Sequence, residues 1–280
     1  MILGNGLIGL LAEKIVGGPV VGCGRSRFYS FRPPLADDYV TYDERTAEIL
    51  HTIPSKRFHV VKVSLGGQLL NPDDMTYELY CNRVYGTPTH MVKLHRSFVV
   101  SICELRCNQI LETLKPAQSA RPTKIVPGTV FLSDGSSLSY DRLLNTVPLD
   151  ILLKLIGRNM ELEALDVHYA HIQTGELNFE GADEVLVIDD HIEFFKAAKI
   201  GEYDYVLWSK EALNEQIIAK YVQDFRLVQN TVIRRAIPIG LPPDLSELEK
   251  EFHIVCVGSC AQWDDAMDVA SCIKRMVRYG

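Results

Sequence analysis

The sequence predicts an α/β fold in which both ends of the chain enter one parallel sheet. Each end has a strand–glycine–helix pattern: residues 1–9 pass from a short apolar strand into a glycine-rich turn, and residues 252–277 repeat this order around Gly258. Such units build a Rossmann-like, dinucleotide-binding sheet. Because the chain has 280 residues, its middle can form a second, smaller and discontinuous α+β domain, with a ligand crevice between the two.

The first element is organised around a G-x-G-x-x-G turn that joins the strand to an apolar helix over residues 10–16. The first glycine would allow the tight turn, the second would let a pyrophosphate approach the backbone, and the third would let the helix pack closely on the strand. Free N–H groups and the dipole at the helix start favour phosphate. The residues expected to bind a nucleotide are Gly4, Gly6, Leu7, Ile8 and Gly9. A structural glycine turn is the alternative.

The second strand is predicted at residues 19–22, and it ends without the acidic residue that often holds the adenosine ribose there. Arg25 and Arg27 follow instead. Two interpretations stay open. The arginines bind a phosphate, either the 2′-phosphate of NADP or the pyrophosphate of FAD, through charge-assisted hydrogen bonds, or they are solvated on a loop.

Residues 28–42 are rich in aromatic side chains and contain Pro33 and Pro34, which exclude a regular helix. Rigid amphipathic rings can line a pocket. Tyr29 is therefore a candidate catalytic residue, and Arg32 is a candidate for binding an anionic or nucleotide-linked substrate. A well-packed loop over the core is the alternative.

The rest of the chain is predicted to alternate helices and strands. Asp73 marks the start of a helix and Gly86 its end, while Asp134-Gly135 marks a hairpin. Apolar residues at helical spacing favour a helix over 101–114. The helices are expected at 43–53, 75–85, 101–114, 151–156, 211–225 and 265–277. The strands are expected at 58–63, 95–100, 124–132, 165–173, 184–188, 191–200, 203–208, 231–237 (stopped by Pro238) and 252–257.

Composition excludes several classes of protein. The chain is 47% hydrophobic and 23% charged, as globular proteins are, and its net charge of −7 argues against a broad nucleic-acid-binding face. No apolar run is long enough to span a membrane and no signal peptide fits the start. The seven cysteines show no C-x-x-C pair or zinc spacing. We therefore expect a cytoplasmic protein that has no metal site and acts on a small molecule.

Three segments, in order, resemble one family. They are the G-x-G-x-x-G turn at 4–9, V-F-L-S-D-G-S-S-L-S-Y-D-R-L-L-N-T-V-P-L at 130–149, and V-C-V-G-S-C-A-Q-W-D-D-A-M-D at 255–268. The second resembles the D-G to T-x-P passage of flavoproteins with two dinucleotide-binding domains. The third is similar to the closing flavin-binding motif of UDP-galactopyranose mutase and its amine-oxidase and protoporphyrinogen-oxidase relatives.

This resemblance implies FAD as the cofactor. It adds to the nucleotide-binding set Thr146, Pro148, Gly258, Trp263, Ala266 and Met267. In that family the last helix points its N-terminus at the isoalloxazine, where its N–H groups and dipole stabilise negative charge. The strand at 190–196 also resembles a substrate-domain strand that runs beside the flavin and usually carries an arginine. Lys196 stands in that place, and Phe194 is a candidate substrate contact.

Lys196 is the candidate catalytic base, with a surface or salt-bridged lysine as the alternative. Two departures set the chain apart: the acidic residue after the second strand is missing, and Ser259 replaces the usual arginine. The chain would be a minimal version of the family, so substrate and reaction do not transfer with the resemblance.

The sequence thus predicts an FAD-binding domain from residues 1–30, 95–155 and 252–280, with a substrate domain from 31–94 and 156–251. The expected function is an FAD-dependent oxidation of an amine or alcohol carbon, or a flavin-dependent isomerisation or elimination without net redox. Nucleotide-linked compounds are among the candidate substrates. An NADP-dependent reductase and a non-catalytic nucleotide- or partner-binding protein are the alternatives.

Overall fold

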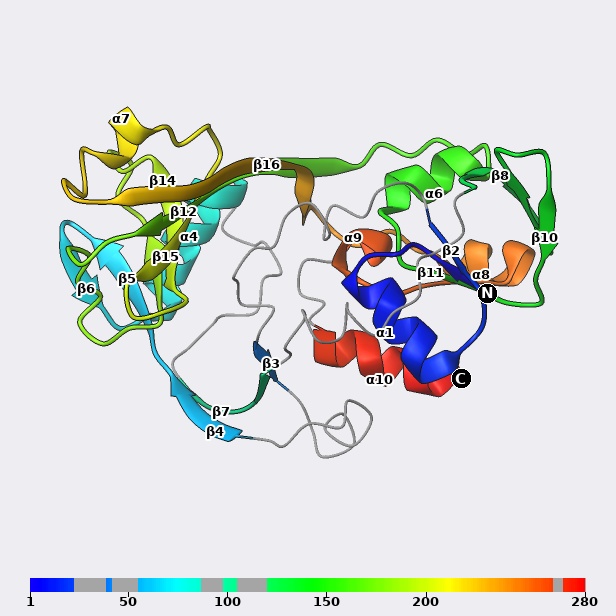
Figure 1. The fold of residues 1–280 in the computed structure, drawn as a ribbon, viewed down its shortest axis with the longest axis horizontal. Coiled ribbons are helices and arrows are strands. Elements are labelled where there is room, and N and C mark those ends of the chain that lie inside the picture. Colours follow the sequence, from blue (N-terminus) through cyan, green and yellow to red (C-terminus); the bar gives the residue numbers. More distant parts are fainter. Residues whose placement is uncertain (23–38, 42–54, 87–97, 105–119, 264–268, 280) are drawn as a thin grey trace.

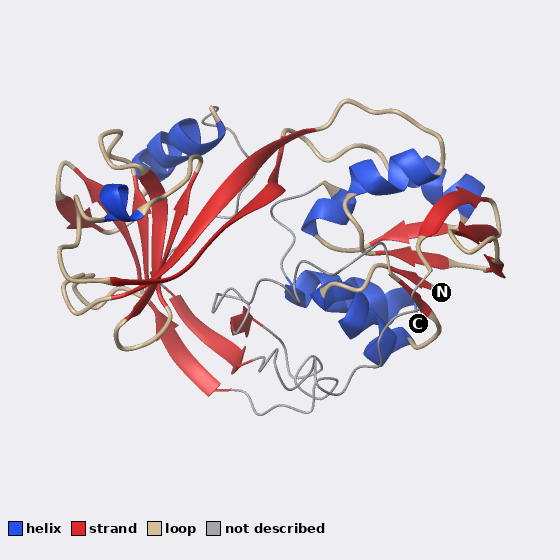
Figure 2. Ribbon diagram, turned by 45° about the horizontal axis from the view of Figure 1, so that its top comes forward, coloured by secondary structure: helices blue, strands red, loops and turns tan. Residues whose placement is uncertain are grey.

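The computed structural model describes residues 1–22, 39–41, 55–86, 98–104, 120–263 and 269–279. They form two lobes (Figure 1). The terminal lobe contains both ends of the chain and a four-stranded sheet, and the sheet lobe contains a seven-stranded sheet. Two long strands connect the lobes (Figure 2). The mixture of parallel and mixed sheets with helices confirms the predicted α/β class.

The sheet of the terminal lobe is parallel throughout. Its strands are β1 (Ile2–Leu3), β2 (Val20–Val21), β11 (Leu143–Asn145) and β17 (Ile254–Cys256). Their order is β17-β11-β1-β2, so β1 lies between β11 and β2. Segments from the start, the middle and the end of the chain therefore meet in one sheet, as the glycine patterns at the two ends predicted.

Alternation along these short strands sends side chains to two cores. Ile2 faces helices α1 (Leu7–Val16) and α10 (Val269–Tyr279), where it packs in a cluster with Leu11 and Met276. Leu3 faces the opposite side and packs with residues of helices α6 and α8. The elements on that side are α6 (Leu149–Leu155), α8 (Ser246–Phe252), α9 (Ser259–Gln262), β8 (Pro122–Val126), β9 (Thr129–Leu132) and β10 (Ser137–Ser139).

The sheet lobe has the strand order β16-β12-β15-β14-β13-β5-β6. The strands are β5 (Val61–Leu65), β6 (Gln68–Leu70), β12 (Glu163–Gln173), β13 (Glu184–Val187), β14 (Phe194–Lys199), β15 (Asp204–Ser209) and β16 (Arg226–Ile239). Helix α4 (Asp74–Tyr85) contributes Tyr80 and Val84 to the core on one face. Leu213 and Ile218, beside and within α7 (Glu215–Ile218), pack on the other face.

A third, antiparallel sheet has the order β3-β7-β4, with β3 (Tyr39–Thr41), β4 (Ser55–His59) and β7 (Phe98–Glu104). The helix predicted from residue 101 is therefore wrong over 101–104, which continue β7. The remainder of that helix and the helix predicted at 43–53 lie outside the described residues.

Helix α4 confirms its predicted limits. The Asp73 carboxylate accepts a hydrogen bond from the Thr76 N–H at 2.8 Å, the Thr76 hydroxyl oxygen accepts one from the Asp73 N–H at 2.9 Å, and Gly86 ends the helix in the left-handed conformation.

Two other predictions need correction. The helix predicted at 211–225 shrinks to α7, because Leu213 and Val222 reach the core from loops on either side.

The second correction concerns the strand that was predicted to stop at Pro238. Pro238 does not stop this strand, because β16 lies at an edge of the sheet, where a missing N–H is tolerated. The C-terminal helix is described over Val269–Tyr279, within the predicted range of 265–277 and two residues beyond it, and its predicted start at residue 265 lies outside the described residues; α9 is a separate turn before it. No helix in the described residues is long and apolar enough to cross a bilayer.

Candidate functional site

The four parallel strands of the terminal lobe end at the same edge of the sheet. Gly4 follows β1, Thr146 follows β11, and Val257 and Gly258 follow β17. Ligands of open parallel sheets bind at this carboxyl edge. Segments distant in sequence, all predicted to bind a nucleotide, are thus brought together here.

The three glycines of the turn stand in different surroundings. Gly4 has a φ of 111°, which disfavours any side chain. A Cβ atom on Gly9 would lie 2.1 Å from the Gly4 carbonyl oxygen, so only glycine lets α1 approach the turn this closely. A Cβ atom on Gly6 would meet no atom of the described residues within 4 Å. The turn is therefore crowded at its two ends and open at its centre.

Helix α1 presents an uncapped N-terminus at this opening. Gly6 is the N-cap residue in an extended conformation, and no side chain in the described part of the chain caps the helix. The first intrahelical bond runs from the Leu10 N–H to the Gly6 carbonyl oxygen at 3.0 Å. The N–H groups of the first turn therefore have no intrahelical acceptor, and the helix dipole favours an anion beside them.

The segment after β11 is fixed by side chains that the sequence did not single out. Asn145 is fully buried; its amide nitrogen donates to the Val147 carbonyl oxygen at 3.1 Å, and its oxygen accepts from the Val147 N–H at 3.3 Å. The same nitrogen lies 3.6 Å from the Sγ atom of Cys256, whose pKa is raised to about 11 by burial. This local network shapes the chain before Pro148, which begins α6. The sequence signal that could have pointed to this network is the polar residue Asn145 at the end of an apolar segment.

The segment after β17 forms hydrogen bonds to the two long strands that connect the lobes. Gly258 has a φ of 114° and precedes α9. The Cys260 thiol donates to the Ala236 carbonyl oxygen of β16 at 3.7 Å. Trp263 is only 1% exposed, and its indole N–H donates to the Glu163 carbonyl oxygen of β12 at 3.1 Å. The structure thus places the Trp263 ring in the core, whereas Gly258 stays at the sheet edge.

Lys196 lies in the sheet lobe, on β14. Its Nζ atom is 3.0 Å from the Glu184 carboxylate and 5.0 Å from the centre of the Trp208 ring. The side chains of Lys196 and Glu184 are 21% and 7% exposed. Phe194, at the start of the same strand, is buried with its ring edge-on to Tyr221 at 5.3 Å. Lys196 therefore has the salt-bridged arrangement that was one of its two interpretations.

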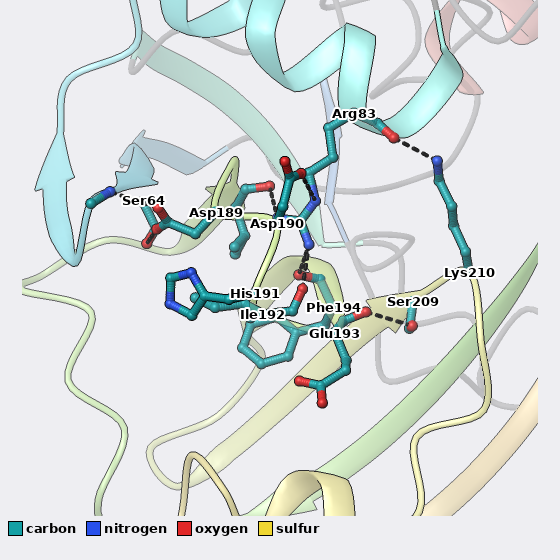
Figure 3. Close-up of polar contacts among 12 residues, drawn as sticks. Ser64, Arg83, Asp189, Asp190, His191, Ile192, Glu193, Phe194, Ser209 and Lys210 are labelled. Carbon is teal, nitrogen blue, oxygen red and sulfur yellow. Dashed lines mark hydrogen bonds and ion pairs between the residues drawn. The ribbon is translucent and has the colours of Figure 1, made fainter.

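The loop before β14 is held by a polar cluster (Figure 3). The guanidinium of Arg83, on α4, donates to the carbonyl oxygens of Val187 at 2.7 Å, of Ile192, and of Phe194 at 3.4 Å. Burial, the largest influence, lowers the pKa of Arg83, and Asp190 counteracts it. Arg83 thus fixes the strand that carries Phe194 and Lys196. Sequence reasoning missed Arg83, because its partners are backbone atoms more than 100 residues away along the chain.

Asp189 anchors the other end of that loop. Its carboxylate accepts hydrogen bonds from the Gly66 N–H at 2.6 Å and from the Ser64 hydroxyl at 3.0 Å. Desolvation is the largest single influence and raises the pKa of Asp189, but these hydrogen bonds together with one from Gly67 outweigh it, so the pKa is lowered.

Six of the predicted site residues lie outside the described residues: Arg25, Arg27, Tyr29, Arg32, Ala266 and Met267. Of the remaining residues, Gly4, Gly6, Leu7, Ile8, Gly9, Thr146, Pro148 and Gly258 gather at the carboxyl edge of the terminal sheet. Lys196 and Phe194 belong to the other lobe (Figure 1). Within the described residues, no group of histidine, cysteine and acidic side chains has the arrangement of a metal site.

No protein-family model matches the chain, and no curated protein matches it in sequence. Its structure is similar to that of reduced UDP-galactopyranose mutase, with a TM-score of 0.70 at 12% identity over 99% of this chain and 92% of the other. An oxidoreductase from Methanosarcina mazei gives 0.62 at 10% identity over 99% and 98%. A CLA-producing fatty acid isomerase from P. acnes gives 0.61 at 7% identity over 99% and 96%. The fold resemblance predicted from three short segments is confirmed.

Proposed function

We propose that the chain is an FAD-dependent enzyme whose cofactor binds along the carboxyl edge of the terminal sheet. The observation that carries this proposal is the uncapped N-terminus of α1 behind an unobstructed Gly6. An extended backbone with room above it among the described residues, beside N–H groups that have no intrahelical acceptor, suits a pyrophosphate. The shared fold with a mutase, an oxidoreductase and an isomerase supports the same conclusion.

The residues present fit this cofactor in distinct ways. The backbone N–H groups at Gly6, Leu7 and Ile8 would hold the pyrophosphate. Gly258, after the neighbouring strand β17, offers a second backbone approach at the same edge. FAD supplies the redox chemistry when bound, while the protein orients it and excludes water.

For the reaction, we propose oxidation of an amine or alcohol carbon, or a flavin-dependent isomerisation or elimination without net redox. The substrate would lie between the terminal sheet edge and the sheet lobe, because β12 and β16 connect the two there. Lys196 would serve this reaction only after exchanging its partner Glu184 for substrate, since the two now form an ion pair. Nucleotide-linked sugars and amines are the first substrates to screen.

The visible spectrum of the freshly purified protein, with the released cofactor identified by mass, tests the proposal. A yellow protein that releases FAD supports it. A colourless protein that cannot be loaded with FAD but binds NADP would support the reductase alternative, for which Arg25 and Arg27 are the motivation. A folded protein that binds neither would overturn the enzyme assignment and favour a non-catalytic role.

A further inference from the structure

One hydroxyl group contacts both crowded glycines of the turn. A Cβ atom on Gly4 would lie 2.4 Å from the Oγ1 atom of Thr146, and one on Gly9 would lie 2.9 Å from the same atom. The hydrogens that replace these Cβ atoms therefore point at Oγ1. Short Cα–H to oxygen contacts of this kind are weakly attractive. The hydroxyl thus sits where the turn begins and where α1 completes its first turn.

The hydrogen of this hydroxyl is already committed. Oγ1 donates to the Leu3 carbonyl oxygen at 3.0 Å, and the Thr146 N–H donates to the same oxygen at 2.8 Å. Leu3 is the last residue of β1, immediately before Gly4. Thr146 therefore connects the end of β11 to the end of β1 and to the start of α1.

We infer that Thr146 is a positioning residue for the ligand site, acting through the glycine turn and not by contact with the cofactor. By fixing Gly4 against Gly9, it fixes the direction of α1 and of the N–H groups at its start. This inference rests on the proposed function, because those N–H groups are the proposed pyrophosphate ligands. It also gives a physical reason for finding the T-x-P segment and the glycine turn in the same chain. The T-x-P segment supplies the hydroxyl group that the glycine turn packs against.

The first test separates positioning from stability. Thr146→Val keeps the shape of the side chain but removes the donor, and Thr146→Ser keeps the hydroxyl. Val130→Ala is the matched control, since Val130 is fully buried in the same lobe but lies on β9, away from the turn. FAD dissociation constants are measured by titration well below the unfolding temperature of each variant.

We expect Thr146→Val to weaken FAD binding by about tenfold, the effect of losing one well-placed hydrogen bond. Thr146→Ser should bind FAD within about twofold of the wild type, and Val130→Ala should lose thermal stability without losing affinity. Unchanged affinity in Thr146→Val would overturn the inference. So would an equal loss of affinity in the Val130→Ala control, because the loss would then follow stability alone.

The second test needs no cofactor. Thermal unfolding of the apoprotein is compared for Gly4→Ala in the wild-type and Thr146→Ala backgrounds. Because the added methyl group collides with Oγ1, the loss caused by Gly4→Ala should be smaller by about 4 °C once the hydroxyl is gone. Gly6→Ala, which meets no neighbour, should give additive shifts with Thr146→Ala.

The two tests keep the inference and the proposed function apart. If the wild-type protein does not bind FAD, the proposed function fails, and the coupling between Gly4 and Thr146 alone decides whether the hydroxyl shapes the turn. Additive shifts for Gly4→Ala and Thr146→Ala would overturn the inference whatever the protein binds.

Discussion

The carboxyl edge of the terminal sheet and the polar cluster before β14 are both built from buried or half-buried polar groups, but they use them in opposite ways. At the sheet edge, among the residues that the structure describes, α1 starts without a side-chain cap and Gly6 has no neighbour where a Cβ atom would lie. In the cluster, Arg83 donates to three carbonyl oxygens, and Asp189 accepts hydrogen bonds from Ser64, Gly66 and Gly67. The N–H donors at the start of α1 have no intrahelical acceptor, whereas the polar groups of the cluster already bond to protein partners.

This difference supports the proposed location of the ligand site. A buried donor without a partner is costly, so a protein that keeps such donors near its surface gains by binding an acceptor there. Groups that already satisfy one another gain little from a ligand, and separating them is costly. The difference therefore supports the proposed ligand site at the terminal sheet edge and a structural role for the cluster around Arg83.

The largest expected effect comes from Gly9→Ala. Its methyl group would lie 2.1 Å from the Gly4 carbonyl oxygen, so α1 must move, at a cost of about 3 kcal/mol. Thermal unfolding should then fall by roughly 6–12 °C. Gly6→Ala is the matched control and should leave stability nearly unchanged. Equal losses in the two variants would remove the contrast between the crowded and open positions of the turn.

The ion pair on β14 is expected to give the next effect. Lys196→Met leaves Glu184 buried without this partner, which should cost about 2 kcal/mol, below the usual cost for a fully buried pair because Lys196 is partly exposed. Adding Glu184→Gln should recover part of the loss. Urea denaturation measures both, and FAD affinity should stay unchanged. Lost turnover at full stability would instead place Lys196 in the active site and contradict a purely structural role for the ion pair.

The smallest effect is expected from Asp189→Asn, at about 1 kcal/mol near neutral pH. The lowered pKa of Asp189 means that folding favours its ionised form, because the Gly66, Ser64 and Gly67 hydrogen bonds outweigh desolvation. Its contribution is therefore complete above the ordinary pKa of about 3.9 and is lost as the pH falls through the lowered value. The stability difference between wild type and variant, measured in urea, should shrink in acid. A difference that grows in acid would contradict this account.

The sequence predicted those features that depend on neighbouring residues. The glycine turn, the Asp73 cap of α4 and the strands at the two chain ends are local patterns of backbone geometry. Such patterns carry their physical cause within a few residues. They predicted that the two chain ends enter one sheet, but not that β11 lies between β1 and β17 in it.

The partners of the polar side chains could not be predicted in this way. Lys196 meets Glu184 because β13 and β14 pair in a register that places Leu186 opposite Lys196. A shift of one residue would send Lys196 to the other face. Likewise, the position of Pro238 on an edge strand depends on the order of the whole sheet.

The position of Gly6 is the centre of this account, and Gly6→Val tests it most directly. The Cβ atom of the valine meets no described residue, and the extended backbone of Gly6 suits any side chain, so the variant should unfold at the wild-type temperature. Its side chain would nevertheless occupy the space above the start of α1. FAD titration of the folded variant, beside Gly6→Ala and wild type, is the measurement. We predict that Gly6→Val retains its fold and loses FAD binding; full cofactor occupancy in that variant would contradict the assignment of the site.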